Sequence, residues 1–216
     1  MGLLLSGGLD SAILLFQLLA HDWQVRPFYI RTGCVWQGEE LQAVRRLLAA
    51  LRQPGLLPLV ELDLPLEDLY AGHWSMTGQA VPDGTTSDEA VFLPGRNPLL
   101  LVKPAVWCAM HGISQLALAT LAANPFGDAT PDFFAQFEAM MLQATGRALQ
   151  IVRPFEQLSK RCVMQMGRDA PLEFTFSCLA PVAGKHCGRC NKCAERATAF
   201  AFLSTGDPTP YAEEVA

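Results

Sequence analysis

The sequence has no apolar run long enough to cross a membrane, and it carries little charge. Every stretch of 18 residues contains charges or helix breakers, and the most apolar segment, residues 97–112, includes Pro98, Lys103 and Pro104. Aspartate and glutamate outnumber lysine and arginine by 21 to 16, so the net charge is −5. This balance argues against a general electrostatic attraction to nucleic acid. We therefore expect neither a membrane nor direct nucleic-acid contact among its partners.

A secretion signal and a disulfide framework are also lacking. The first residues, MGLLLSGGLDS, have no basic segment and no small-residue cleavage site, so we expect no cleaved leader. The seven cysteines are an odd number, and four of them lie within 16 residues near the C-terminus, whereas Cys34, Cys108 and Cys162 are scattered. This pattern is typical of a reduced, cytoplasmic protein with one metal site.

What the sequence does contain is a regular alternation of strand-like and helix-like segments. Half of the 216 residues are hydrophobic, which is enough for one domain with a substantial core. Strands are predicted at 2–5, 25–30, 57–62, 115–119 and 149–152, and helices at 11–20, 39–52, 97–112, 131–145, 159–166 and 190–203. This order predicts an α/β fold, a doubly wound, mostly parallel five-stranded sheet with helices on both faces. Such sheets bind ligands at the carboxyl ends of their strands.

The segment Ser6-Gly7-Gly8-Leu9-Asp10-Ser11 joins the first predicted strand to the first helix. The two glycines allow a sharp turn close to a ligand, and the free N–H groups of the helix start attract an anion. Asp10 suits a helix N-terminus or a magnesium partner. The Gly-Lys-Ser/Thr ending of the ATPase phosphate loop is missing, so cleavage of that type is not implied. For a Gly-Gly pair alone, a plain turn is the alternative.

Four cysteines near the C-terminus have the spacing C-x8-C-x2-C-x2-C: Cys178, Cys187, Cys190 and Cys193. Zinc takes four ligands at about 2.3 Å in a tetrahedron, and four protein ligands make a structural rather than a catalytic site. An iron–sulfur cluster and a His186 ligand are alternatives. We interpret residues 1–170 as the α/β domain and residues 171–216 as a helical, zinc-binding segment packed on it. Residues 70–90, polar and rich in glycine, are expected to form a mobile loop.

Two further segments lie where a parallel sheet places its ligand. In residues 92–97, Arg96 offers a planar donor fork for phosphate or carboxylate, and Asn97 suits a helix cap or a base edge. In residues 124–132, Asn124, Asp128 and Asp132 offer acceptors for a guanine-like N–H edge, beside an aromatic residue. Plain turns and helix caps are the alternatives for both segments.

These motifs resemble those of a known family. The Ser6–Ser11 segment resembles the PP-loop of the ATP pyrophosphatase superfamily, whose members attack the α-phosphate of ATP and release pyrophosphate. Together with Leu-Pro-Gly-Arg-Asn at 93–97 and the four cysteines followed by Arg196, it resembles the QueC family, the 7-cyano-7-deazaguanine synthases. The resemblance extends over nearly the whole chain. It implies an ATP-dependent C–N ligase that converts 7-carboxy-7-deazaguanine and ammonia to the nitrile through adenylated intermediates, for queuosine-type biosynthesis.

The resemblance also implies partners, cofactors and residue roles. It implies a homodimer that uses ATP, magnesium and zinc, with the four cysteines as zinc ligands. ATP would be held by Ser6, Gly7, Gly8, Leu9, Asp10, Ser11 and Arg31. Asp10, Arg96 and Lys160 would be catalytic, although Lys160 also fits a surface lysine at a helix start. The substrate would be bound by Arg96, Asn97, Asn124, Asp128 and Asp132.

Three segments depart from the family pattern, and one of them is the 70–90 loop with His73-Trp74-Ser75. Residues 124–132 replace an acidic, glycine-rich sequence, and residues 31–36 replace an aromatic-Gly-Gln turn. A paralogue that forms an amide from a deazaguanine carboxylate is therefore an alternative. A tRNA thiolation enzyme that uses Cys34 and a non-enzymatic zinc-ribbon interaction protein are two others.

Overall fold

The computed structural model describes residues 1–215, and its centre is a five-stranded parallel sheet. The strands are β1 (Gly2–Leu4), β2 (Arg26–Arg31), β3 (Val60–Asp63), β4 (Gln115–Ala117) and β5 (Gln150–Val152). They lie in the order β3-β2-β1-β4-β5, and each neighbouring pair is parallel. The predicted sheet is confirmed.

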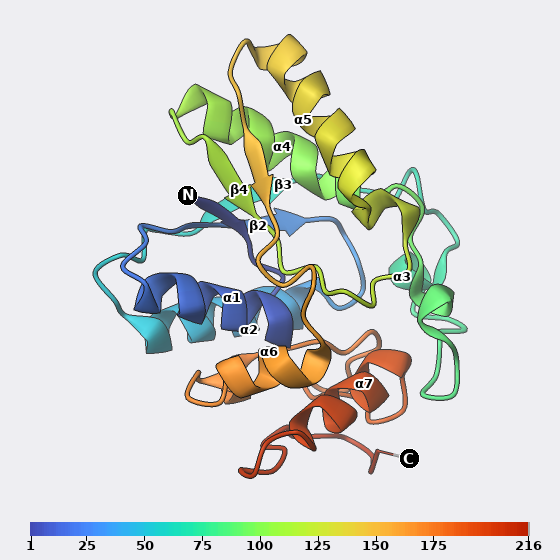
Figure 1. Cartoon of the computed structure of the whole chain (residues 1–216). Helices are drawn as coiled ribbons and strands as arrows, with labels where there is room; N and C mark the ends of the chain where they lie inside the picture. Colours follow the sequence, from blue (N-terminus) through green and yellow to red (C-terminus); the bar gives the residue numbers. More distant parts are fainter. Residues whose placement is uncertain (216) are drawn as a thin grey trace.

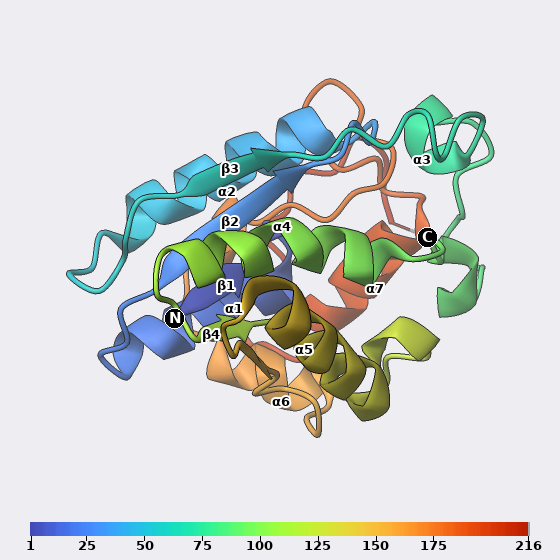
Figure 2. The ribbon, with the colours of Figure 1, turned by 90° about the horizontal axis from the view of Figure 1, so that it is seen from above.

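Helices cover both faces of the sheet (Figures 1 and 2). Helices α1 (Leu9–Ala20), α2 (Gln37–Leu51), α6 (Lys160–Met166) and α7 (Asn191–Phe200) lie on one face, and α4 (Arg96–Met110) and α5 (Pro131–Thr145) on the other. Successive strand residues divide between two cores: Tyr29 and Ala117 pack toward α1 and α2, whereas Phe28 and Leu116 pack toward α4 and α5. This alternation is the two-residue period of a strand buried on both faces. All six predicted helices are present, with ends within three residues of those predicted.

One strand differs from its prediction for a clear reason. Residues 57–62 were expected to form the third strand, but β3 begins at Val60. Leu57 does pair with Val25, through an N–H that donates to the Val25 carbonyl over 2.9 Å. Pro27, the next β2 residue that faces β3, then has no N–H to donate, and the Pro58 carbonyl accepts instead from the Arg26 guanidinium over 2.8 Å, so the ladder is interrupted until Val60.

The segment expected to be a mobile loop is held against the C-terminal part of the chain. It contains a short helix, α3 (Trp74–Thr77), and a 3-10 helix, η1 (Asp88–Val91). The indole of Trp74 stacks on that of Trp36, with ring centroids 5.7 Å apart. The backbone N–H of Asn191 donates to Pro82 O over 2.9 Å, and its side-chain amide donates to Thr86 O over the same distance. The polar composition indicated a loop, but these anchors come from a distant segment.

The C-terminal residues form a small layer beneath α1 and α2 in Figure 1. It includes the 3-10 helix η3 (Leu172–Phe174) and α7, and α7 also packs on α6. The N–H of Phe176 donates to Gly7 O over 2.8 Å, so this layer touches the loop after β1 directly. Between residues 1 and 215, no helix is long and apolar enough to span a membrane.

Candidate active site and metal centre

A cavity of about 800 Å³ opens at the carboxyl ends of β1 and β4. These strands are neighbours, yet the chain continues from β1 toward β2 and β3 on one side and from β4 to β5 on the other. A parallel sheet binds ligands at such a point, because the connections after the two strands diverge and leave a crevice. Leu5 and Ser6 after β1, and residues 118–121 after β4, line the cavity.

The Ser6–Ser11 loop forms the base of this cavity. Gly7 has a φ of +79°, and a Cβ there would lie 3.0 Å from the Val44 side chain, so only glycine suits this turn. Gly8 precedes α1 without a side-chain cap, which leaves the first-turn N–H groups for a ligand. The hydroxyls of Ser6 and Ser11 lie 3.2 Å apart. The arrangement suits an anion, because a helix start with free N–H groups lies beside two hydroxyl donors.

Four charged side chains run from this loop to the C-terminal layer. Lys160 Nζ contacts both carboxylate oxygens of Asp10, at 2.8 and 2.7 Å, and Glu195 Oε1 at 3.1 Å. Lys192 Nζ lies 2.5 Å from Glu195 Oε2. All four residues line the cavity. The network therefore joins α1, α6 and α7 at the point where an anion would bind.

The pKa values of this network reflect its burial and its pairing. Burial raises the pKa of Asp10, against the lowering effect of the Lys160 ammonium. Burial alone would lower the pKa of Lys160, but the carboxylates of Asp10 and Glu195 raise it above its usual range. Burial opposes ionisation of Glu195 too, yet Lys192 and Lys160 lower its pKa to about 2. Lys160 is therefore a fixed cation at neutral pH.

The loops before α4 and α5 meet at Asp128. The Asn97 backbone N–H donates to Asp128 Oδ2 over 3.1 Å, and the Asn97 amide donates to the Asp128 carbonyl over 3.0 Å. Thr130, not Asp128, caps α5 by accepting from the Phe133 N–H. Arg96 lines the cavity beside this junction and takes part in none of the ion pairs found within residues 1–215. Its guanidinium therefore has no ion-pair partner among the described side chains and can pair with a bound anion.

Aromatic side chains form part of the cavity wall. Phe92 and Phe126 stack with ring centroids 5.1 Å apart and an angle of 26° between their planes. They come from the segments before α4 and α5 and line the same cavity as Arg96. Flat apolar faces beside a guanidinium suit a planar heterocycle that carries an anionic group.

The structure does not bring every predicted residue to the cavity. Arg31 pairs instead with Asp63 on the neighbouring strand, with Nε and Oδ1 2.7 Å apart. Asp132 is exposed in the first turn of α5. Asn124 does line the cavity, and its side-chain oxygen accepts from the Phe126 N–H over 3.0 Å. Gly7 supports the loop from behind rather than facing the cavity.

Several cavity residues were missed by sequence reasoning. Tyr29, Glu40 and Glu195 line the cavity. In the sequence, Tyr29 and Glu40 look like ordinary strand and helix residues, and no motif includes Glu195. Lys192 stands between two of the cysteines, where a cation is expected simply to balance thiolate charge. The sequence position of Lys192 and Glu195 could have indicated them. Both follow Cys190 within α7, and their spacing of three residues puts them on one side of this helix.

Cys34, the residue considered for thiolation, lines the cavity as a buried thiol. Thr32 donates its hydroxyl hydrogen to Cys34 Sγ over 3.3 Å. Burial nevertheless raises the pKa of the thiol. A protonated thiol is a weak nucleophile, so the site does not activate Cys34.

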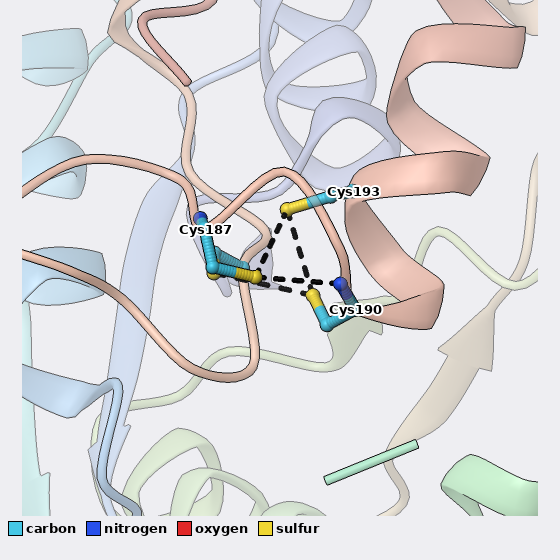
Figure 3. A group of neighbouring side chains, drawn as sticks. Cys187, Cys190 and Cys193 are labelled. Carbon is cyan, nitrogen blue, oxygen red and sulfur yellow. Dashed lines mark hydrogen bonds between the residues drawn. The ribbon is translucent and has the colours of Figure 1, made fainter. Parts of the chain in front are cut away.

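The four predicted cysteines come together in one buried cluster. Figure 3 labels three of them, Cys187, Cys190 and Cys193. All four sulfur atoms lie within 4.8 Å of one another. Sγ of Cys178 lies 4.0 Å from that of Cys190, and Sγ of Cys193 lies 3.8 Å from Cys187 and 3.5 Å from Cys190. Zinc–sulfur bonds of about 2.3 Å in a tetrahedron separate the sulfurs by about 3.8 Å. The donor set and its dimensions therefore fit zinc.

The backbone around the cluster is arranged for thiolates. N–H groups of Leu179 and Cys187 donate to sulfur over 3.4 and 3.2 Å. Gly188, with a φ of +87°, permits the turn between Cys187 and Cys190, and a Cβ there would lie 2.1 Å from Glu213 O. Cys190 precedes α7 and Cys193 lies in its first turn. The start of α7 is thus fixed by the same residues that would hold the metal.

His186, the alternative ligand, points elsewhere. Its Nε2 accepts a hydrogen bond from the Ser177 N–H over 3.2 Å, and its ring packs on Phe176 with centroids 4.4 Å apart. Burial lowers the pKa of His186 to about 3, which keeps the ring neutral and able to accept this bond. The four cysteines therefore form the whole candidate shell.

The doubly wound parallel sheet, with its glycine loop at the switch point and its tetrathiolate segment, places the chain in the PP-loop class. Within that class, the chain belongs to the QueC family: the family model described as "Queuosine biosynthesis protein QueC" matches residues 2–204. It is similar to 7-cyano-7-deazaguanine synthase 1 of Desulfitobacterium hafniense, with 30% identity over 92% of this chain and 90% of the relative. It is also similar to the 7-cyano-7-deazaguanine synthase of Anaeromyxobacter dehalogenans, with 31% identity over 97% of this chain and 94% of the relative.

Similarity to solved structures is more remote. A 4-thiouridine synthetase in complex with RNA and ATP aligns with 83% of this chain and 45% of its own, at 19% identity and a TM-score of 0.49. A predicted subunit of tRNA methyltransferase from Methanocaldococcus jannaschii aligns over 76% and 72%, at 12% identity and a TM-score of 0.47. Similarity at this level says nothing about activity.

Proposed function

We propose that this QueC-family enzyme uses ATP to convert 7-carboxy-7-deazaguanine and ammonia to 7-cyano-7-deazaguanine. One observation carries the proposal: the Ser6–Ser11 loop opens into the same cavity as Arg96, which forms no ion pair among the described side chains, and a stacked aromatic pair. The first feature suits the phosphates of ATP. The other two suit a planar heterocycle with a carboxylate.

ATP would lie with its phosphates on the start of α1. The first-turn N–H groups and the hydroxyls of Ser6 and Ser11 would donate to phosphate oxygens. Lys160 supplies a positive charge that stabilises the departing pyrophosphate. Asp10 is the carboxylate within this loop, paired with Lys160, and would hold magnesium, which supplies further charge neutralisation when bound with ATP.

The deazaguanine would lie across the opposite half of the cavity. Phe126, stacked with Phe92, offers a face for the heterocycle. Arg96 would pair with the substrate carboxylate, because its guanidinium forks match two carboxylate oxygens. Asn97 and Asp128 are already hydrogen-bonded to each other. They would therefore hold this wall of the cavity in place and offer their remaining polar atoms to the base. We assign Arg31 and Asp132 no contact with the substrates.

The reaction follows from this placement. A carboxylate oxygen attacks the α-phosphate, the bond to pyrophosphate breaks, and an acyl adenylate forms. Ammonia then attacks the acyl carbon, and AMP leaves with the former carboxylate oxygen, which gives the amide. The amide oxygen attacks a second ATP in the same way, and loss of AMP and a proton leaves the nitrile. No protein nucleophile is required, so catalysis consists of positioning and charge stabilisation.

Incubation with 7-carboxy-7-deazaguanine, ATP and ammonium chloride, followed by mass spectrometry, tests the proposal. We expect the nitrile together with AMP and pyrophosphate. An amide that accumulates without nitrile would identify the chain as an amide-forming paralogue. Absence of both products and of AMP would refute the proposal. A Cys34→Ser variant should keep its activity, because Cys34 is a buried, protonated thiol.

Residues 171–216 would stabilise the site rather than react in it. We propose that they form a zinc-binding segment packed on the 1–170 domain, with zinc as a structural ion. The bond from Phe176 to Gly7 and the ion pair between Glu195 and Lys160 support this division. A cytoplasmic location fits the seven free cysteines.

A homodimer is proposed on the basis of one helix face. Val102, Val106 and Met110 recur every four residues on α4 and are 39%, 39% and 76% exposed. An apolar stripe of this kind suits a second copy of the chain. Light scattering should give twice the 23.5 kDa chain mass, and a Val106→Glu variant should lower it toward one chain.

A further inference from the structure

A carboxyl group that the reaction above does not use lies deep in the cavity. Glu40, in the first turn of α2, lines the cavity, and its Oε2 accepts a hydrogen bond from the Tyr29 hydroxyl over 2.7 Å. Tyr29 comes from β2, and its ring is buried in the core between the sheet and α1. Glu40 Oε1 has no hydrogen-bond partner among residues 1–215.

Glu40 lies directly behind the loop proposed to bind phosphate. A Cβ on Gly7 would lie 3.2 Å from the Glu40 carbonyl oxygen and 3.5 Å from its Cγ. The titratable groups that face the Glu40 carboxyl or its tyrosine partner are Tyr29 on β2, Cys34 after β2 and Arg96 on α4. Glu40 therefore lies near both the loop proposed to bind phosphate and the arginine proposed to hold the substrate carboxylate.

The protonation states of this pair suit proton transfer at neutral pH. Burial raises the pKa of Glu40 to about 7, although the Tyr29 hydrogen bond and the Arg96 charge both lower it. Burial and the nearby Glu40 carboxylate raise the pKa of Tyr29 above its usual range, so Tyr29 stays a donor. A base whose pKa lies near the working pH is the most effective proton acceptor.

The nucleophile of the proposed reaction needs such a group. Ammonia is mostly ammonium at neutral pH, and ammonium has no lone pair with which to attack. A partly buried carboxylate with one oxygen free of protein hydrogen bonds can bind a small cation and accept its proton. The only other carboxylates that line the cavity within the described residues are Asp10 and Glu195, which are paired with lysines, and Asp128, which is bonded to Asn97.

We propose that Glu40 binds the ammonium ion and accepts its proton, and that Tyr29 is a positioning residue that holds the carboxyl toward the acyl adenylate. This role rests on the proposed function. One N–H bond of ammonium breaks, and its proton moves to Glu40. The freed lone pair attacks the acyl carbon, the C–O bond to AMP breaks, and a second N–H proton leaves to solvent as the amide forms.

A Glu40→Gln variant separates this role from ATP binding. The glutamine keeps an oxygen that can accept from Tyr29, but it cannot take a proton. Exchange of labelled pyrophosphate into ATP, measured with 7-carboxy-7-deazaguanine and no ammonium, should stay within about twofold of the unaltered enzyme. Amide formation with ammonium should fall about 100-fold, the lower range for loss of a general base. Glu39→Gln, one residue away on α2, is the matched control and should change neither rate.

Two further readouts distinguish a proton acceptor from a merely structural residue. Hydroxylamine is largely unprotonated at neutral pH, so it should restore hydroxamate formation by Glu40→Gln to near the rate of the unaltered enzyme. In Tyr29→Phe, loss of the hydrogen bond should raise the pH midpoint of amide formation, because that bond lowers the pKa of Glu40.

The possible outcomes are distinct. Equal loss of pyrophosphate exchange and amide formation in Glu40→Gln would make Glu40 part of the ATP site and overturn the proposal. Undiminished amide formation with ammonium would overturn it as well. If the unaltered enzyme shows no exchange with this substrate, the proposed function itself fails, and the role of Glu40 fails with it.

Discussion

Among single residues, Lys160 joins the most parts of the site. Its ammonium contacts Asp10 on α1 and Glu195 on α7, and both carboxylates raise its pKa. It lies at the loop where the pyrophosphate would depart. A fixed cation at that point stabilises negative charge that develops only as the α-phosphate is attacked.

Replacement of Lys160 tests this role. Lys160→Met keeps the length of the side chain and removes the charge, so we expect adenylation to slow by roughly 100- to 1,000-fold, the range for loss of one charge-stabilising group. Pyrophosphate exchange measures this step. Lys185→Met, at an exposed position, is the control and should exchange normally. A Lys160→Met variant that folds and exchanges at the normal rate would place the charge stabilisation elsewhere.

Residues of the site differ in how far the sequence could predict them. The Ser6–Ser11 loop and the four cysteines are short local patterns whose spacing already constrains their geometry. Glu40 and Glu195 could not be predicted in the same way, because their place depends on how α2 and α7 pack against distant parts of the chain. Arg31 shows the reverse case: it lies at the carboxyl end of β2, where a ligand would bind, but it forms an ion pair with Asp63 on the neighbouring strand.

At the scale of elements, two glycines with positive φ have different tasks. Gly146 ends α5 with a φ of +67° and faces open space. Gly188, with a φ of +87°, turns between two of the cysteines, where a Cβ would meet the Glu213 backbone at 2.1 Å. Both glycines adopt a positive φ that other residues rarely adopt, but only Gly188 also allows another backbone segment to pack closely against it.

Alanine at each glycine measures the difference. Gly146→Ala should cost about 1 kcal/mol of unfolding free energy, since only backbone strain is added. Gly188→Ala adds the collision with residue 213, so we expect a loss of more than about 2 kcal/mol together with reduced zinc content. Chemical denaturation measures the unfolding free energy, and atomic emission measures the zinc content. Equal losses in the two variants would contradict the close packing around Gly188.

Helices and strands were predicted well wherever their hydrophobic pattern runs without interruption. Helices with a proline or a capping residue at their start, such as α5 with Thr130 and α6 with Ser159, had recognisable beginnings. Strand β3 was misplaced because Pro27 on β2 interrupts its pairing, and a proline within an apolar run leaves the boundary undecided. Helix α3 was missed, since its four residues depend on the packing of Trp74 against Trp36.

At the scale of the whole molecule, the segment that carries the four cysteines forms one wall of the proposed active-site cavity. Asn191, Lys192 and Glu195 line the cavity, and all three lie on the helix whose start carries Cys190 and Cys193. The position of α7 therefore links the metal centre to the charge network around Asp10.

Metal removal should for this reason affect both regions. Dialysis against a strong chelator should lower the melting temperature and make the four buried cysteines reactive to a thiol reagent, beyond the exposed Cys162. Pyrophosphate exchange should fall at the same time, because Glu195 no longer holds Lys160 in place. A metal-free protein with unchanged melting and exchange would show that the four cysteines have no structural role.

The class of fold could be predicted from sequence because alternating strands and helices leave few topologies open. The cavity wall formed by the cysteine segment could not, since it depends on contacts between residues more than 100 positions apart, such as Asp10 and Lys160 or Gly7 and Phe176.

The central claim is that a deazaguanine carboxylate attacks the α-phosphate of ATP in this cavity. The direct test uses 7-carboxy-7-deazaguanine labelled with oxygen-18 in its carboxylate, together with ATP and ammonium, and mass spectrometry of the nucleotide products. We predict AMP that carries one labelled oxygen, transferred when the acyl adenylate is cleaved by ammonia. Label in inorganic phosphate with release of ADP, or unlabelled AMP, would contradict the proposed reaction.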